Sequence, residues 1–172
     1  LFKPSIIFGE DDNFINRFSK LIKISPLIFP LACHDAKFAP VYVGDVVSVM
    51  ADALTNGRSI GKVYELCGSK IYTLHEIVNY ILQLTGRHRY IIKMGKLLSK
   101  MQAVLLERVP GKPFTLDNYY SLQVESICKE SFLNLFNFEP TSLESIVPNY
   151  LARQSTRNNY TLYRQEARRI KK

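Results

Sequence analysis

Short apolar runs alternate with amphipathic segments along this 172-residue chain. Of all the features of the sequence, this alternation most restricts the fold classes that the chain can adopt. The stretch SIIF at 5–8 is bounded by Pro4 and Gly9, which is typical of a strand buried on both faces of a parallel sheet. Further strands are expected at 40–43, 62–68 and 89–94. Apolar residues between these runs recur at helical spacing, so the sequence predicts an α/β fold.

Several of the expected helices carry start and stop signals. The oxygens of residues 11–13 can cap a helix that begins near Phe14, and Asp45 can cap the next. The inward face of that second helix is expected to consist of Val46, Val49, Met50, Ala53 and Leu54, with Asn56 and Gly57 at its end. Capping boxes, in which a Thr oxygen and a Glu carboxylate satisfy free backbone donors, are predicted at Thr73 with Glu76 and at Thr141 with Glu144. Gly86 is expected to end the helix that Thr73 opens.

The net charge of +8 is carried mainly by one end of the chain. Residues 152–172 hold seven basic residues and one acid, which leaves residues 1–151 near neutrality. We therefore expect a globular portion over 1–151 and a frayed or partly helical basic tail over 152–172. A nucleic-acid-binding fold would spread basic charge over a structured face, so we expect no nucleic-acid partner.

The segment 95–108 forms a further amphipathic helix with two open interpretations. Its apolar face could pack in the core, or it could attach to a membrane surface or to a partner protein. The three cysteines, Cys33, Cys67 and Cys128, are far apart and form no C-x-x-C pair. That spacing argues against a disulfide framework or a zinc site and favours reduced thiols in a cytosolic protein.

Several catalytic signatures are missing from the sequence. The eight glycines never adopt G-x-G-x-x-G spacing, and no G-K-[ST], H-E-x-x-H or G-x-S-x-G motif occurs. None of the ten tyrosines is followed by Lys four residues later. His34 and Asp35 are the one adjacent acid–base pair, but neighbours in sequence usually point apart, so we assign no catalytic residue and no metal ligand.

Four stretches resemble, in the same order, the C-terminal half of extended short-chain dehydrogenases. They are FKPSIIFG, NFINRFSKLI, FAPVYVGDV and GKVYELCGSKIYTLHEIV. That family, which includes NAD-dependent epimerases and dehydratases, shows R-P-x-x-x-[FY]-G, then P-V-x-V-x-D-V, then Y-E-L-G-G. Two further stretches resemble the subgroup related to the NAD(P)H-binding accessory subunit of respiratory complex I: KLLSKMQAVLLERVPGKPFTLDNYYSL and FEPTSLESIVPNYL. The resemblance covers about residues 1–151.

The resemblance implies the C-terminal part of a Rossmann-like fold with a small substrate subdomain, and NAD or NADP as cofactor. Pro4, Ser5 and Ile6 match the segment whose backbone lies along the nicotinamide end of the cofactor; alternatively, Pro4 merely starts a buried strand. Asn13 and Phe14 match positions that face the substrate in relatives that modify sugar nucleotides; alternatively, they belong to a capped helix with Phe14 in the core. Lys3 departs from the Arg of the family motif.

The main functional hypothesis is a C-terminal fragment of an NAD(P)-binding epimerase-, dehydratase- or reductase-like protein. It would be inactive alone, because the Gly-rich turn and the Tyr/Lys pair are absent from this sequence. The alternative is a non-catalytic structural or assembly subunit of the complex I accessory type, peripheral to a membrane. The expected partners are a missing N-terminal half of the same fold, a second copy through an exposed sheet edge, and a membrane or protein complex contacted by the basic tail. The expected location is cytoplasmic or peripheral on the inner membrane.

Overall fold

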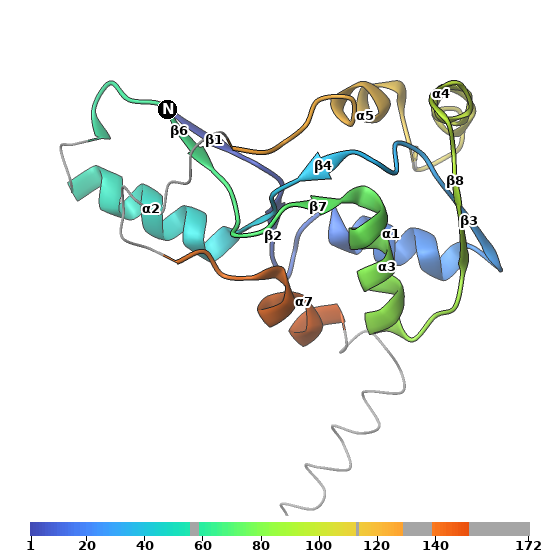
Figure 1. Ribbon diagram of the computed structural model, residues 1–172, viewed down its shortest axis with the longest axis horizontal. Helices are drawn as coiled ribbons and strands as arrows, with labels where there is room; N and C mark the ends of the chain where they lie inside the picture. The colour runs from blue at the N-terminus through green and yellow to red at the C-terminus, as the bar shows by residue number, and fades with distance from the viewer. Residues whose placement is uncertain (56–58, 113, 129–138, 152–172) are drawn as a thin grey trace, which may run out of the picture.

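The computed structural model describes residues 1–55, 59–112, 114–128 and 139–151. Short strands and longer helices alternate through these ranges, which confirms the predicted α/β class (Figure 1). The strands are β1 (Phe2–Pro4), β2 (Ile7–Phe8), β3 (Ile28–Leu31), β4 (Lys37–Phe38), β5 (Val41–Tyr42), β6 (Tyr64–Leu66), β7 (Tyr72–Thr73) and β8 (Tyr90–Lys93). The helices are α1 (Ile15–Ile24), α2 (Val43–Thr55), α3 (Leu74–Thr85), α4 (Lys96–Leu106), α5 (Leu116–Ser121) and α7 (Leu143–Leu151).

The strands pair mostly in parallel. β1 lies beside β6, β2 beside β5 and β3 beside β8, whereas β4 and β7 are antiparallel. Each parallel pair joins strands that a helix separates in the sequence, as parallel pairing requires.

Of the strand expected over 5–8 only residues 7–8 form one, β2, and β1 ends just before this range with a different partner. The Ser5 amide donates to the carbonyl of Leu66 at the end of β6, 2.9 Å away. One residue later the partner changes, because the Ile6 carbonyl accepts from the Val41 amide of β5 at 2.9 Å. Burial on both faces was also wrong, since Ile7 is 38% exposed. Residues 5 and 6 thus bridge two neighbouring strand pairs.

Two apolar clusters hold the described residues together. The larger one gathers side chains of β2, β3, β4, α1, α3 and α7, and the smaller one lies between α2 and strands β5 and β6. Val46 and Val49 are buried in the smaller cluster as predicted. Met50 and Leu54, expected on the same face, are 40% and 89% exposed, because that cluster covers only the first turns of α2.

The predicted start of α1 and both predicted ends of α3 are confirmed. The Asp12 carboxylate accepts from the Ile15 amide at 2.5 Å and so caps α1. Thr73 and Glu76 form the predicted capping box, in which the Glu76 amide donates to Thr73 Oγ1 at 3.2 Å. Gly86 ends α3 in the left-handed region at φ 63°. Asn56 and Gly57, expected at the end of α2, lie outside the described residues.

Asp45 has a different role from the predicted helix cap. Its side chain is 4% exposed and accepts two hydrogen bonds from Thr141, from the amide at 2.6 Å and from Oγ1 at 2.8 Å. Thr141 lies just before α7. Asp45 therefore connects the start of α2 to the start of α7, which a local cap signal could not reveal.

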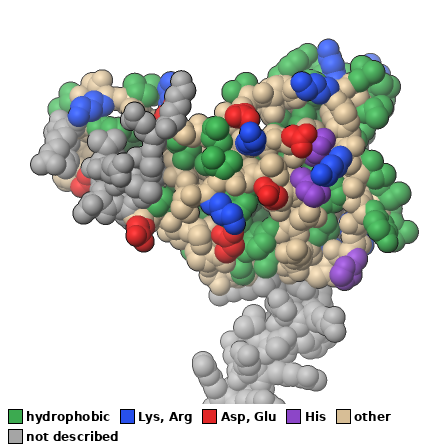
Figure 2. Space-filling model, in the orientation of Figure 1, with side chains coloured by type: hydrophobic (Ala, Val, Ile, Leu, Met, Phe, Trp, Pro, Cys, Tyr) green, Lys and Arg blue, Asp and Glu red, His purple; other side chains and the backbone are tan. Residues whose placement is uncertain are grey.

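Helix α4 presents its large side chains outward. Its buried residues are Ser99 and Ala103, whereas Leu97, Leu98, Met101 and Leu105 are between 54% and 74% exposed. The interpretation that the apolar face of this helix packs in the core is therefore wrong: its buried residues are small, and these four large ones stay more than half exposed, three of them along an open cavity. Figure 2 shows hydrophobic side chains gathered over α4 and along β8.

The cysteines also differ from expectation. Cys67 and Cys128 form a disulfide across 61 residues, and Cys33 remains free. The fold brings together thiols whose separation in the sequence gave no signal. Within the described ranges, none of the helices is long and apolar enough to span a membrane, and no group of three or more potential metal ligands occurs.

Candidate functional site

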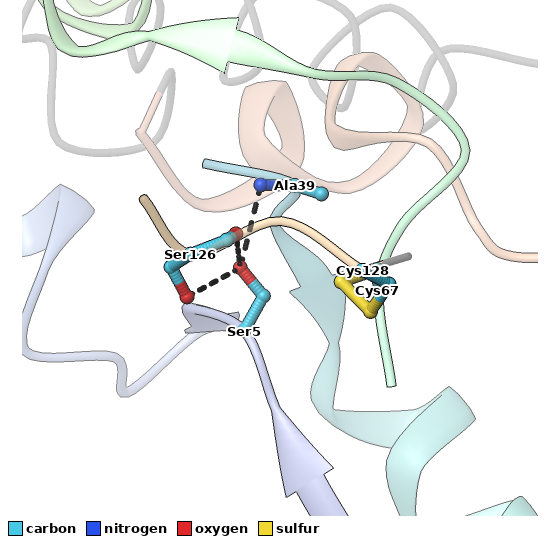
Figure 3. Close-up of a disulfide and its surroundings, with 5 residues drawn as sticks. All are labelled: Ser5, Ala39, Cys67, Ser126 and Cys128. Atoms are coloured by element: carbon cyan, nitrogen blue, oxygen red, sulfur yellow. Dashed lines mark hydrogen bonds between the residues drawn. A yellow bond between two sulfur atoms is a disulfide. The ribbon is translucent and has the colours of Figure 1, made fainter. Parts of the chain in front are cut away.

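Ser5 lies at the centre of a small network of hydrogen bonds (Figure 3). Its hydroxyl donates to the Ser126 carbonyl at 2.6 Å and lies 3.0 Å from Ser126 Oγ. The Ala39 amide donates to the same Ser5 oxygen at 3.3 Å. Since the single hydroxyl proton is held by the Ser126 carbonyl, Ser5 positions the backbone and is not poised to give a proton to a ligand.

The segment that contacts Ser5 is fixed at both ends. Ser126 adds to the edge of β4, because its amide donates to the Lys37 carbonyl and its own carbonyl accepts from the Ala39 amide, each at 3.0 Å. Two residues further on, Cys128 is joined to Cys67, which directly follows β6 (Figure 3). The disulfide and the Ser5 network therefore clamp the 126–128 segment over the junction of β1 and β2.

Pro4 and Ile6 lie on either side of Ser5 and take no part in the hydrogen bonds of its side chain. Pro4 ends β1 opposite Leu66 and is exposed, so the alternative that it starts a buried strand is wrong. Ile6 is half-buried and packs against the larger apolar cluster. The backbone from 4 to 6 is thus held between β5 and β6.

Asn13 and Phe14 line a cavity of about 1020 Å³. Asn13 is exposed, whereas Phe14 packs edge-on against Phe18 and Phe38 with ring centres 5.2 and 5.7 Å apart. Phe14 thus packs against the larger cluster and also lines the cavity, while its position facing a substrate stays a prediction. Ile6 lies in the same wall, as does Ser126, whereas Pro4 and Ser5 do not line the cavity.

The rest of the cavity wall is mostly apolar. It is formed by side chains of α1, β3 and α4, together with residues in and beside α5. Among the described lining residues Arg17 alone is ionisable. Gln102 of α4 donates from Nε2 to the Pro30 carbonyl at 3.3 Å, while its buried Oε1 has no hydrogen-bond partner in the part of the chain that the structure describes.

Sequence reasoning missed Arg17, Gln102 and Ser126. Arg17 occupies a solvent-facing position of an amphipathic helix, which in a sequence is indistinguishable from an ordinary surface residue. Gln102 and Ser126 meet the site only through contacts between distant segments. No local signal marks any of the three.

His34 and Asp35 do contact each other, contrary to expectation, with His34 Nε2 3.0 Å from Asp35 Oδ2. The His75 amide donates to the His34 carbonyl at 3.1 Å. Burial lowers the pKa of His75, and the electrostatic influence of the nearby Lys93 and His34 lowers it further. None of these side chains lines the cavity, so they form a separate surface cluster.

The fold is similar to that of solved epimerases and reductases, in line with the Rossmann-like fold that the sequence resemblance implied. A nucleoside-diphosphate-sugar epimerase from Staphylococcus aureus matches with a TM-score of 0.57 and 15% identity, over 88% of this chain and 50% of that one. A dTDP-4-dehydrorhamnose reductase from Bacillus anthracis, solved in complex with NADP, matches with a TM-score of 0.55 and 15% identity, over 88% and 45%. No protein-family model matches the chain.

The sequence itself is similar to a subunit of respiratory complex I, which confirms the second part of the resemblance. The mitochondrial NADH dehydrogenase [ubiquinone] 1 alpha subcomplex subunit 9 of Arabidopsis thaliana is 26% identical over 143 residues, covering 77% of this chain and 36% of the relative. The same subunit of Dictyostelium discoideum is 35% identical over 86 residues, covering 50% and 24%. The chain therefore matches only about a third of the length of the first relative and about a quarter of the second. Both relatives are mitochondrial by name, so the expected cytoplasmic location is not confirmed.

Proposed function

We propose that this chain forms the ligand-side portion of an NAD(P)-binding protein of the extended short-chain dehydrogenase type. The observation that carries the proposal is the fold, shared with proteins solved in complex with NAD or NADP. Pro4, Ser5 and Ile6 would lie along the nicotinamide end, where the Ser5 network and the disulfide hold the backbone in place. Asn13 and Phe14 would face the second ligand from the cavity wall.

The residues present fit only the nicotinamide end of such a cofactor. A dinucleotide is gripped at its phosphates by a Gly-rich turn at a helix N-terminus, and the sequence contains no such spacing. When bound, the cofactor would supply hydride chemistry, for which this chain offers positioning residues and no Tyr/Lys pair. The chain alone should therefore neither bind NAD(P) tightly nor catalyse, and a separate segment would have to supply the phosphate site.

Two measurements test this proposal. Calorimetric titration of the 172-residue chain with NADPH should show no tight binding, and a micromolar dissociation constant would refute this expectation. The gene should encode G-x-x-G-x-x-G upstream of Leu1. Upstream glycines without Y-x-x-x-K would favour a binding subunit over an enzyme, and the absence of both would count against the nucleotide proposal altogether.

A second candidate function is that of an accessory subunit of a respiratory complex. It is favoured by the similarity to alpha subcomplex subunit 9, found in relatives from a plant and an amoeba. Separation of the native membranes on a blue native gel, followed by mass spectrometry, should find the protein with NADH dehydrogenase subunits. Migration of the protein only as a free species would argue against membership.

The division of the chain is part of the proposal. Residues 1–151 would form the folded portion, and the basic residues 152–172 would contact an acidic partner or an anionic membrane surface. Co-sedimentation with phosphatidylserine-containing vesicles should fall when 152–172 are deleted, whereas vesicles of phosphatidylcholine alone should retain neither form. Equal sedimentation of both forms would leave the tail without this role.

A further inference from the structure

We propose that the cavity between α1, β3 and α4 binds a long-chain fatty acid, with its carboxylate at Arg17 and its hydrocarbon chain along the apolar wall. The inference rests on the proposed assignment of Asn13 and Phe14 to the ligand side of the fold. It deepens that assignment by naming the class of ligand.

The wall of the cavity suits a hydrocarbon chain. Phe18 and Leu21 of α1, Phe29 of β3 and Leu98 and Met101 of α4 all line it. A volume of about 1020 Å³ lies at the upper end of the range for small-molecule sites. Burial of each further methylene should tighten binding about fourfold, until the chain fills the space.

The positive charge of Arg17 determines where the carboxylate of the fatty acid would bind. Arg17 is the single ionisable residue among the described residues of the wall, and its guanidinium is exposed at the edge of α1. One of its N–H groups donates to the Lys112 carbonyl at 2.5 Å, which holds the guanidinium between α1 and the loop after α4. A guanidinium has five N–H donors, so it can also bind a carboxylate.

A nucleoside diphosphate fits this cavity less well. Two phosphates call for several cationic side chains or a helix N-terminus with available amides, and the wall offers one cation. At the start of α1, beside Asn13 and Phe14 of the wall, the carboxylate of Asp12 already accepts from the Ile15 amide, and its negative charge disfavours a second anion there.

Gln102 provides a way to distinguish a fatty acid from a neutral lipid as the ligand of this cavity. Its Oε1 is a buried acceptor without a partner in the described part of the chain, so it would repel a carboxylate and would accept from a hydroxyl. A fatty acid should therefore depend on Arg17, whereas a fatty alcohol of equal length would depend on Gln102.

The test is displacement of a fluorescent fatty-acid analogue from the full chain, without nucleotide, by saturated acids of increasing length and by hexadecanol, all below their micellar concentrations. We expect affinity to rise with length, and palmitate to bind at least fivefold more tightly than hexadecanol. Arg17→Gln should abolish that preference, with Lys20→Gln, an exposed position of α1 outside the cavity, as its control. Met101→Glu should weaken both ligands at least tenfold, while Leu97→Glu, exposed on the same helix but outside the cavity, should not.

Several outcomes would overturn the inference. Hexadecanol binding at least as tightly as palmitate, with loss in Gln102→Leu, would assign the cavity to a neutral lipid. Equal effects of Met101→Glu and Leu97→Glu would mean nonspecific surface binding. Self-association that Met101→Glu abolishes, without displacement by any acid, would assign the cavity to a second copy of the chain. Because nucleotide is omitted, failure of NAD(P) binding in the assembled protein would leave this result standing, and the reverse also holds.

Discussion

Asp45 shows at the scale of one residue how this fold joins distant segments. Its buried carboxylate satisfies both the amide and the hydroxyl of Thr141, so the start of α7 depends on a side chain of α2. Asp45→Asn keeps the shape but turns an N–H group toward one of these donors and removes the charge. We expect a loss of about 2 kcal/mol in the free energy of unfolding, measured in urea. Asp52→Asn, exposed on the same helix, should stay within about 0.5 kcal/mol, and an equal loss in both variants would contradict this role.

Gly68 is required by a close approach of two backbones. A Cβ atom at this position would lie 1.9 Å from the Pro40 carbonyl oxygen, and the Gly68 amide donates to Ala39 at 3.1 Å. Gly68→Ala must therefore push residues 39–40 away from the end of β6, at a cost of about 1–3 kcal/mol. Thermal unfolding should show the loss, and Ser69→Ala at the next, exposed position serves as the control.

At the scale of elements, α3 depends on its capping box. Hydrogen bonds from Thr73 lower the pKa of Glu76 below its usual value, because they favour the ionised carboxylate. A depressed pKa stabilises the folded state at pH values above the unfolded pKa, and the gain is lost as pH falls through the folded pKa. The stability difference between wild type and Glu76→Gln should thus be present at pH 7 and vanish in strong acid. A difference that persists unchanged at pH 2 would contradict the capping role of the charge.

The bounds and the exposure of an element could be predicted only where the residues that determine them lie close to it in the sequence. The ends of α3 could be predicted because the capping hydrogen bonds of Thr73, Glu76 and Gly86 are all made within that helix and its first flanking residues. The outward face of α4 could not, because periodicity identifies an apolar face without saying what covers it. The same holds for the site: Pro4–Ile6 and Asn13–Phe14 were predicted by motif, whereas Arg17, Gln102 and Ser126 join the cavity wall only through folding.

At the scale of the whole molecule, the Cys67–Cys128 disulfide ties the end of β6 to the segment that contacts Ser5. The bridge closes a loop of 61 residues. Its removal should raise the conformational entropy of the unfolded state and so lower the free energy of unfolding by about 4 kcal/mol. Cys128→Ser should lower the urea midpoint accordingly, while Cys33→Ser, the free cysteine, should lower it much less. A reductant should bring the wild type to the midpoint of Cys128→Ser and leave that variant unchanged. If the wild type keeps its midpoint under full reduction, the clamp over the β1–β2 junction is held by the Ser5 hydrogen bonds and the edge of β4 alone.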